Sequence, residues 1–152
     1  MRRLIMLLSA LLASGARLAA QQLGPRDLDT LPITQPTVVV HYGSDSLQFG
    51  ELRLPPGQGP FPVAVVIHGG CWRAEIANLR NSAAVASALP PEGIATWNIE
   101  YRRLGNRGGG WPGTFADVGA AIDYLRVLAS QYPLDLARVV LVGHSAGAHL
   151  AV

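Results

Sequence analysis

The sequence predicts an α/β fold: a mainly parallel sheet flanked by helices, with an antiparallel hairpin at its N-terminal end. From residue 63 onward, short apolar runs rich in valine and isoleucine alternate with helical patterns. Two further strand patterns precede them and are joined by a short segment of turn residues. Two of the apolar runs end directly in glycine-containing motifs, which predicts sharp turns at the ends of those strands.

Residues 1–20 are typical of a secretory signal peptide. Arg2 and Arg3 form a positive start, residues 4–13 form an apolar run of the expected length, and a plausible cleavage site follows Ala20. The run is shorter than the ~20 apolar residues that a membrane-spanning helix needs. We therefore expect an exported protein, periplasmic or secreted, with no membrane span in the mature chain. An uncleaved N-terminal anchor is the alternative.

The composition is typical of a globular protein, and the length fits one domain. The chain has 152 residues, of which 49% are hydrophobic and 14% are charged. All 12 basic residues are arginines, and three of them precede residue 21, which leaves nine arginines against ten acidic residues. This balance does not favour nucleic acid as a partner. Cys71 is the single cysteine, which excludes an intramolecular disulfide. A free thiol is unusual in an exported protein but is acceptable if it is buried.

Residues 21–36 carry three prolines and few apolar residues, which predicts a linker before a folded domain at residues 37–152. The domain is expected to open with a β-hairpin. Residues 37–42 and 47–54 have strand patterns, and Gly-Ser-Asp-Ser at residues 43–46 joins them.

A glycine-rich motif, His-Gly-Gly-Cys-Trp, follows the apolar strand at residues 63–68. Glycine permits unusual φ angles and a close approach, so bare backbone N–H groups can reach a substrate oxygen here. We predict an oxyanion hole in which Gly70 and Cys71 donate and Gly69 shapes the turn. His68 is expected to organise this loop rather than to act as a general base. An ordinary glycine-rich strand exit is the alternative.

A helix and a further strand are predicted next. Residues 78–89 have a helical pattern that ends at two prolines, and residues 94–101 form a largely apolar strand. Residues 102–113 form a long loop with three consecutive glycines. The loop lacks the Gly-Lys-Ser/Thr of a phosphate-binding loop, so a nucleotide site is not predicted.

Residues 114–132 are predicted to form the following helix, which a proline ends. Thr114 and Asp117 match a capping box, in which Thr114 is the N-cap and Asp117 reaches back. Asp123 is expected on a solvated face, and Asp135 in the turn before the last strand. None of these three carboxylates is predicted to be catalytic.

The last strand carries the second motif. Residues 139–142 are continuously apolar, as expected for a strand covered on both faces, and Gly-His-Ser-Ala-Gly follows at residues 143–147. A serine nucleophile stands on a strained turn, where the residues two before and two after lie too close to other backbone to carry side chains. We predict Ser145 as the nucleophile and the N–H of Ala146 as a further oxyanion donor. A chance Gly-Ser-Gly loop is the alternative, which the flanking apolar strand and alanine-rich helix disfavour.

Together these residues resemble the α/β-hydrolase superfamily, most closely its carboxylesterase-type members, including the feruloyl-esterase-like (BD-FAE-like) and aryl-formamidase-like groups. The resemblance covers residues 37–152. Cys71 stands where the loop of these enzymes usually has a glycine. The matching features, in chain order, are His-Gly-Gly-Cys-Trp at 68–72, Asn-Ile-Glu-Tyr-Arg-Arg at 98–103, the helix with Asp117, and Gly-His-Ser-Ala-Gly at 143–147.

The resemblance implies a serine hydrolase that cleaves small-molecule carboxylic esters through an acyl-enzyme on Ser145, without metal or organic cofactor. In this superfamily the acid and then the histidine follow the nucleophile, so both are expected beyond Val152. His149 is not expected to be the base, because it lies in the helix body after the strained turn. His144 is expected to point away from the serine hydroxyl. We therefore expect the chain to be the N-terminal part of a hydrolase.

Two alternatives stay open. One is an amide or peptide hydrolase of the same fold, such as an aryl formamidase or an exopeptidase, since the serine machinery would be identical. The other is a non-catalytic remnant or binding domain. As written, the chain would lack turnover that depends on a triad, and it should fold poorly because the strand before Ser145 would be an exposed edge.

Overall fold

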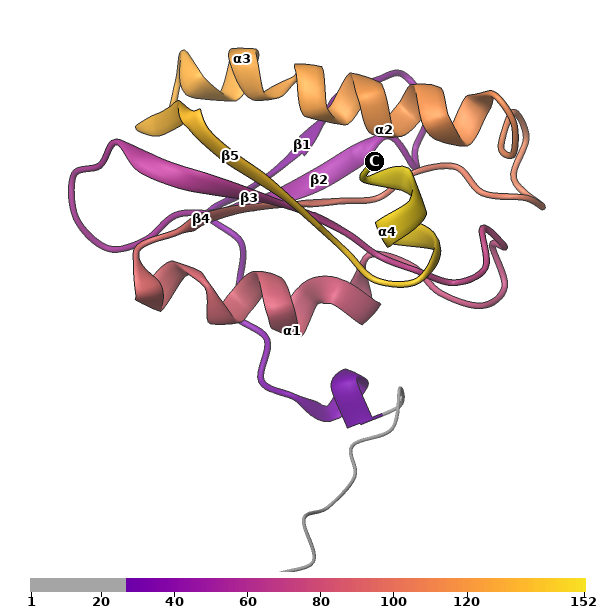
Figure 1. Ribbon diagram of the computed structural model, residues 1–152, viewed down its shortest axis with the longest axis horizontal. Helices are drawn as coiled ribbons and strands as arrows, with labels where there is room; N and C mark the ends of the chain where they lie inside the picture. Colours follow the sequence, from indigo (N-terminus) through magenta and orange to yellow (C-terminus); the bar gives the residue numbers. More distant parts are fainter. Residues whose placement is uncertain (1–26) are drawn as a thin grey trace, which may run out of the picture.

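The computed structural model describes residues 27–152, which form one mixed sheet between helices (Figure 1). The predicted signal peptide at residues 1–20 lies outside the described residues. The strands are β1 (Val38–His41), β2 (Phe49–Arg53), β3 (Phe61–Ile67), β4 (Ala95–Ile99) and β5 (Leu134–Gly143). The helices are α1 (Arg80–Ala88), α2 (Gly113–Asp123), α3 (Leu125–Ala129) and α4 (Ala146–Leu150), with short 3-10 helices η1 (Asp27–Thr30) and η2 (Pro90–Glu92).

The strands lie in the order β1-β2-β4-β3-β5. The predicted hairpin is confirmed, since β1 and β2 pair antiparallel, and β2 also pairs antiparallel with β4. The strands β4, β3 and β5 run parallel. In the pairing of β3 with β5, Ile67 stands opposite Gly143. The two strands that precede the glycine motifs therefore end side by side at the same edge of the sheet.

Helices cover both faces of the sheet, with α2 and α3 on one side and α1 on the other (Figure 1). Side chains of β3 alternate between the two layers, as a strand requires. Val65 and Ile67 belong to the larger core with Trp97 and the buried residues of α2 and α3. Ala64 and Val66 pack on the other face against Ala86 of α1. No helix among the described residues is long and apolar enough to span a bilayer.

The described part of the predicted linker is tied to the domain by hydrogen bonds. The backbone N–H of Thr34 donates to the Ser87 hydroxyl on α1 over 3.0 Å. The guanidinium of Arg53, which is buried on β2, donates to the Thr34 carbonyl over 3.0 and 3.1 Å. The segment before β1 therefore lies against α1 and the end of β2.

The predicted capping box is wrong. Helix α2 begins at Gly113, with Pro112 at the N-cap position and no side-chain cap. The Thr114 hydroxyl donates to the Arg102 carbonyl, and the Asp117 carboxylate accepts two bonds from the Arg102 guanidinium, over 2.8 and 2.6 Å. Asp117 is 1% exposed and also accepts from the Gln48 amide. A guanidinium gives the carboxylate stronger, charge-assisted bonds than a backbone N–H would, and the local spacing cannot show this partner.

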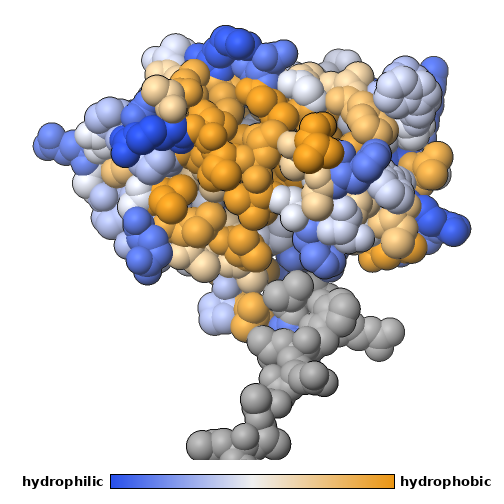
Figure 2. All heavy atoms as spheres, viewed as in Figure 1, coloured by the Kyte–Doolittle hydropathy of each residue, from blue (hydrophilic) through white to orange (hydrophobic). Residues whose placement is uncertain are grey.

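The structure also differs from two further expectations. The predicted helix at residues 114–132 is divided at Tyr124 into α2 and α3, and it ends at Ala129. The segment 139–142 belongs to an edge strand of the described sheet, as expected for the chain as written, but it is not covered on both faces as its apolar pattern predicted. Val139 and Val140 are 38% and 53% exposed, because within residues 27–152 strand β5 pairs only with β3. Figure 2, viewed as in Figure 1 with β5 in front, shows apolar surface on this side.

We expect Asp117→Asn to destabilise the full-length protein by about 2 kcal/mol at neutral pH, because the charge-assisted hydrogen bonds between the buried Asp117 carboxylate and the partly exposed Arg102 guanidinium are weakened. Burial raises the pKa of Asp117, but hydrogen bonds from Arg102 and Gln48 outweigh burial and hold this pKa below its ordinary value. A lowered folded-state pKa stabilises the fold above the unfolded-state pKa, and that contribution is lost as the pH falls through the folded-state pKa. The difference measured by urea unfolding should therefore shrink in acid.

Asp123→Asn in the same helix is the matched control. Asp123 pairs with Arg126, but both side chains are exposed, and such pairs contribute at most about 1 kcal/mol. Equal losses of stability in the two variants would contradict the role assigned to the pair of Asp117 with Arg102. So would a loss in Asp117→Asn that stays the same in acid.

Candidate active site

Ser145 occupies a strained turn between β5 and α4. Its φ is 53° and its ψ is −118°, a conformation that costs a residue with a side chain free energy. A Cβ on Gly143 would lie 2.3 Å from the Gly147 carbonyl oxygen, and one on Gly147 would lie 2.1 Å from the Ile67 carbonyl oxygen. Both obstacles are backbone and cannot move aside. Only glycine fits two residues before and two residues after the serine, which is the steric reason for the spacing of this motif.

Helix α4 begins directly after the serine. The N–H of Gly147 donates to the His144 carbonyl, and those of Ala148 and His149 donate to the Ser145 carbonyl. The N–H of Ala146 belongs to the first residue of the helix, so it has no acceptor within the helix. The Ala146 N–H is therefore not used by the helix, which is compatible with the donor role predicted for it.

The loop after β3 lies against the serine turn. Gly70, Cys71 and Trp72 have successive positive φ angles of 109°, 52° and 57°, so the chain turns sharply as it leaves the sheet. A Cβ on Gly69 would lie 2.8 Å from the His144 carbonyl oxygen and 3.3 Å from the Ser145 Cβ. The structure thus brings the predicted oxyanion loop and the predicted nucleophile together.

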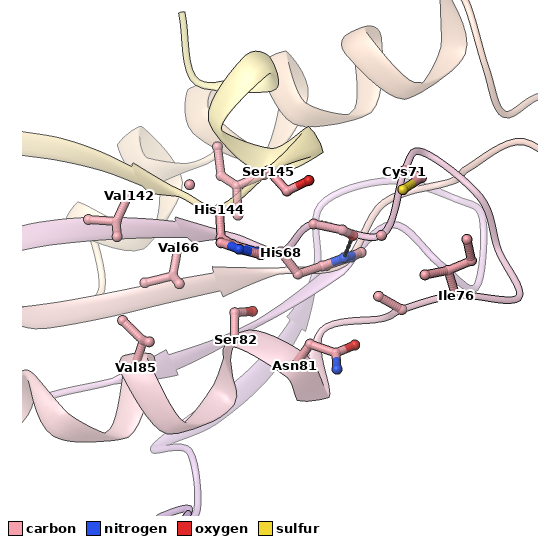
Figure 3. Close-up of a pocket in the computed structure, with 15 residues that line it drawn as sticks. Val66, His68, Cys71, Ile76, Asn81, Ser82, Val85, Val142, His144 and Ser145 are labelled. Atoms are coloured by element: carbon pink, nitrogen blue, oxygen red, sulfur yellow. Dashed lines mark hydrogen bonds between the residues drawn. The ribbon is translucent and has the colours of Figure 1, made fainter. Parts of the chain in front are cut away.

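The loop, the serine turn and the start of α1 enclose a cavity of about 400 Å³ (Figure 3). Ser145 and Cys71 both line it, and Cys71 is exposed. The thiol is therefore not buried, because the loop carries Cys71 to the lining of the cavity instead of into the core. The rest of the lining consists of Val66, Ile67, His68, Gly69, Gly70, Ile76, Ala77, Asn81, Ser82, Val85, Val142, Gly143 and His144.

His68 is buried at the base of the loop and makes contacts that keep it away from the serine hydroxyl. Its Nδ1 lies 2.8 Å from the Gly69 carbonyl oxygen, and its Nε2 lies 2.9 Å from Oε1 of Glu100. The Tyr101 ring stacks on the imidazole with centroids 4.3 Å apart, and the Tyr101 hydroxyl donates to the His68 carbonyl over 2.6 Å. These contacts support the organising role predicted for His68.

Glu100 is the site residue that sequence reasoning missed. Its Oε1 accepts from the Tyr101 N–H and lies 3.2 Å from Nη2 of Arg103, and its Oε2 accepts from the Leu79 N–H before α1. Burial raises the pKa of Glu100, but the hydrogen bond and charge of His68 and the backbone donors outweigh burial, so this pKa lies below its ordinary value. A carboxylate directly after a buried strand was the available signal.

No described histidine bonds to the Ser145 hydroxyl, and this hydroxyl forms no hydrogen bond within residues 27–152. His149 lies in α4, where its ring meets Trp72 edge-on at 5.3 Å and Phe115 at 5.8 Å. His41 lies on β1, at the opposite edge of the sheet from β5. Among residues 27–152, the predicted nucleophile thus lies beside the glycine-rich loop and has no histidine at its hydroxyl.

Comparisons with known proteins find one matching family model and several similar proteins. Residues 51–152 match the family model BD-FAE. Esterase LipC of Mycobacterium tuberculosis (strain ATCC 25618 / H37Rv) is 30% identical over 114 residues, which are 74% of this chain and 28% of LipC. The structure of a bifunctional GH43-CE protein of Bacteroides eggerthii is 31% identical, with a TM-score of 0.64, over 74% of this chain and 16% of that chain. A bacterial heroin esterase is 27% identical, with a TM-score of 0.64, over 86% of this chain and 39% of that chain.

The chain spans less than half the length of each of these proteins. Its mixed sheet and flanking helices have the α/β-hydrolase fold of the esterase structures that it resembles, which confirms the predicted fold class. The family model covers both glycine motifs and every strand from β3 to β5. The chain belongs to the BD-FAE family.

Proposed function

We propose that the protein containing this chain is an exported serine hydrolase that cleaves small-molecule carboxylic esters. The observation that carries the proposal is the strained Ser145, which lines one cavity with the backbone of the loop that starts at Gly69. Membership of the BD-FAE family and the similarity to proteins named as esterases support the same reaction. Export rests on the sequence pattern of residues 1–20.

The proposed reaction has two steps. Oγ of Ser145 attacks the acyl carbon, and the carbonyl oxygen becomes an oxyanion that accepts hydrogen bonds from the N–H groups of Gly70, Cys71 and Ala146. The alcohol leaves with a proton, and the acyl group stays on Ser145 as an ester. Water then attacks this ester and releases the acid. Loss of one oxyanion donor typically lowers kcat by about 10²–10³.

We assign the general base and its orienting acid to a part of the protein outside residues 27–152. Three described side chains that could act as a base or an acid already make other contacts. His68 contacts Glu100 and Gly69, Asp117 holds the Arg102 guanidinium, and His149 packs against aromatic rings. In α/β-hydrolases the acid and then the histidine follow the nucleophile in the chain. We therefore propose that both follow Ser145.

Ser145→Ala should abolish covalent labelling of the full-length protein by a fluorophosphonate probe, because only an activated serine attacks phosphorus at a useful rate. Intact-mass spectrometry measures the labelling. Ser82→Ala is the matched control, since Ser82 lines the same cavity but its hydroxyl is bonded to Asn98 and to the Leu79 carbonyl. Labelling should persist in Ser82→Ala. A folded full-length protein that takes up no probe would overturn the proposed function.

Alkylation of Cys71 by iodoacetamide should slow this labelling strongly, because the exposed thiol lines the same cavity as Ser145. Cys71→Gly should label normally and should not respond to iodoacetamide. Glycine keeps the backbone N–H, and it adopts the φ of 52° without strain. If the fully alkylated protein labels as fast as the untreated protein, the thiol does not border the reacting serine.

A further inference from the structure

The peptide between Gly69 and Gly70 connects the buried His68 to the oxyanion loop. The carbonyl of Gly69 and the N–H of Gly70 belong to this one planar unit, which is not among the cis peptides of the described chain. In a trans peptide these two groups point in opposite directions. Because Nδ1 of His68 lies 2.8 Å from the Gly69 oxygen, the imidazole fixes the direction in which the Gly70 N–H points.

Both ring nitrogens of His68 face acceptors. Nδ1 faces a carbonyl oxygen, which carries no proton, and Nε2 faces Oε1 of Glu100 at 2.9 Å. A neutral imidazole has one N–H and can satisfy only one of these contacts, whereas an imidazolium donates to both. The geometry is therefore that of a doubly protonated ring, provided that Glu100 is ionised.

The surroundings of Glu100 are those of an ionised carboxylate. Besides His68, the N–H groups of Leu79 and Tyr101 donate to it over 3.0 and 2.9 Å, and the Arg103 guanidinium lies 3.2 Å away. Donors that converge on both oxygens favour the charged form, and so does a neighbouring cation. The side chains of His68, Glu100 and Arg103 are all less than 5% exposed, so water screens their charges little.

We infer that His68 is an imidazolium that Glu100 holds in place, and that it positions and polarises the Gly69–Gly70 peptide so that the Gly70 N–H meets the oxyanion. His68 is a positioning residue, since it acts through this peptide. The inference rests on the proposed role of Ser145. One carboxylate faces two cations here, His68 and Arg103, so the buried cluster carries a net positive charge. A negative charge that develops at the loop is stabilised by that excess, and the donating ring strengthens the Gly70 N–H as a donor.

Nuclear magnetic resonance of the full-length protein with isotope-labelled histidine tests the charge without any activity measurement. The chain has four histidines, and variants of His41, His144 and His149 assign the His68 signals by elimination. We expect protons on both ring nitrogens of His68 at neutral pH. In Glu100→Gln the amide N–H₂ can donate to Nε2, so the ring should become neutral while Nδ1 keeps its contact with Gly69. A neutral His68 ring in the unaltered protein overturns the inference.

Two substitutions of His68 separate the contact with Gly69 from the contact with Glu100. The Asn amide in His68→Asn stands near the position of Nδ1 and can still donate to the Gly69 carbonyl, whereas the longer Gln amide in His68→Gln reaches toward Glu100. We expect the rate of fluorophosphonate labelling to fall by on the order of 10² in His68→Gln and clearly less in His68→Asn, because one oxyanion donor is misdirected only in the former. Thermal unfolding of both variants measures any general loss of structure.

The outcomes for the inference and for the proposed function differ. If the two His68 variants label at equal rates, or if His68→Gln labels like the unaltered protein, the positioning role is wrong although Ser145 remains a nucleophile. If the unaltered protein does not label at all, the proposed hydrolase is wrong, and the protonation state of His68 is still measured by resonance.

Discussion

The site depends on the parallel pairing of β3 with β5. Its register places Ile67 opposite Gly143, so the two strands end at the same level and the chain leaves both in the same direction. The loop after β3 and the serine turn, which are far apart in sequence, therefore begin as neighbours. A slip of one residue would turn the side chains of a strand to the opposite face. Val65 and Ile67 would then leave the core with Trp97, so the packing of the core and the alignment of the two turns are fixed by the same interaction.

The two turns meet through backbone rather than through side chains. The Gly147 Cα lies against the carbonyl of Ile67, and Gly69 lies against the carbonyl of His144. Such contacts leave no room for side chains, and they put peptide N–H groups next to the serine. The direction of each N–H depends on the contacts that hold its peptide plane. In this loop those contacts come from buried side chains: the Tyr101 hydroxyl donates to the His68 carbonyl, and the His68 imidazole contacts the Gly69 carbonyl.

Local sequence pattern predicts the parts of the molecule that local sterics and periodicity determine. The hairpin, the strand before each glycine motif and the tight turn at Ser145 fall into this class. The predicted cap of Asp117 fails because the position of this carboxylate depends on a partner that is distant in sequence. Asp117 finds a guanidinium from the loop after β4. The exposure of Val140 likewise depends on which strand lies beside β5, and its own sequence, typical of a buried strand, carries no such information.

Arg102 and Arg103 show how much this distinction matters. In sequence they stand side by side at the start of a glycine-rich loop, and the local pattern shows no partner for either. In the structure they point to different partners: Arg102 holds Asp117 on α2, and Arg103 contacts Glu100 and the Ala77 carbonyl before α1. The loop after β4 thus ties together the layers on both faces of the sheet at the edge where the apolar core ends. A buried cation is costly unless it is paired. Glu100 meets this need for Arg103 and also contacts His68, so one buried carboxylate links the loop after β4 to the loop after β3.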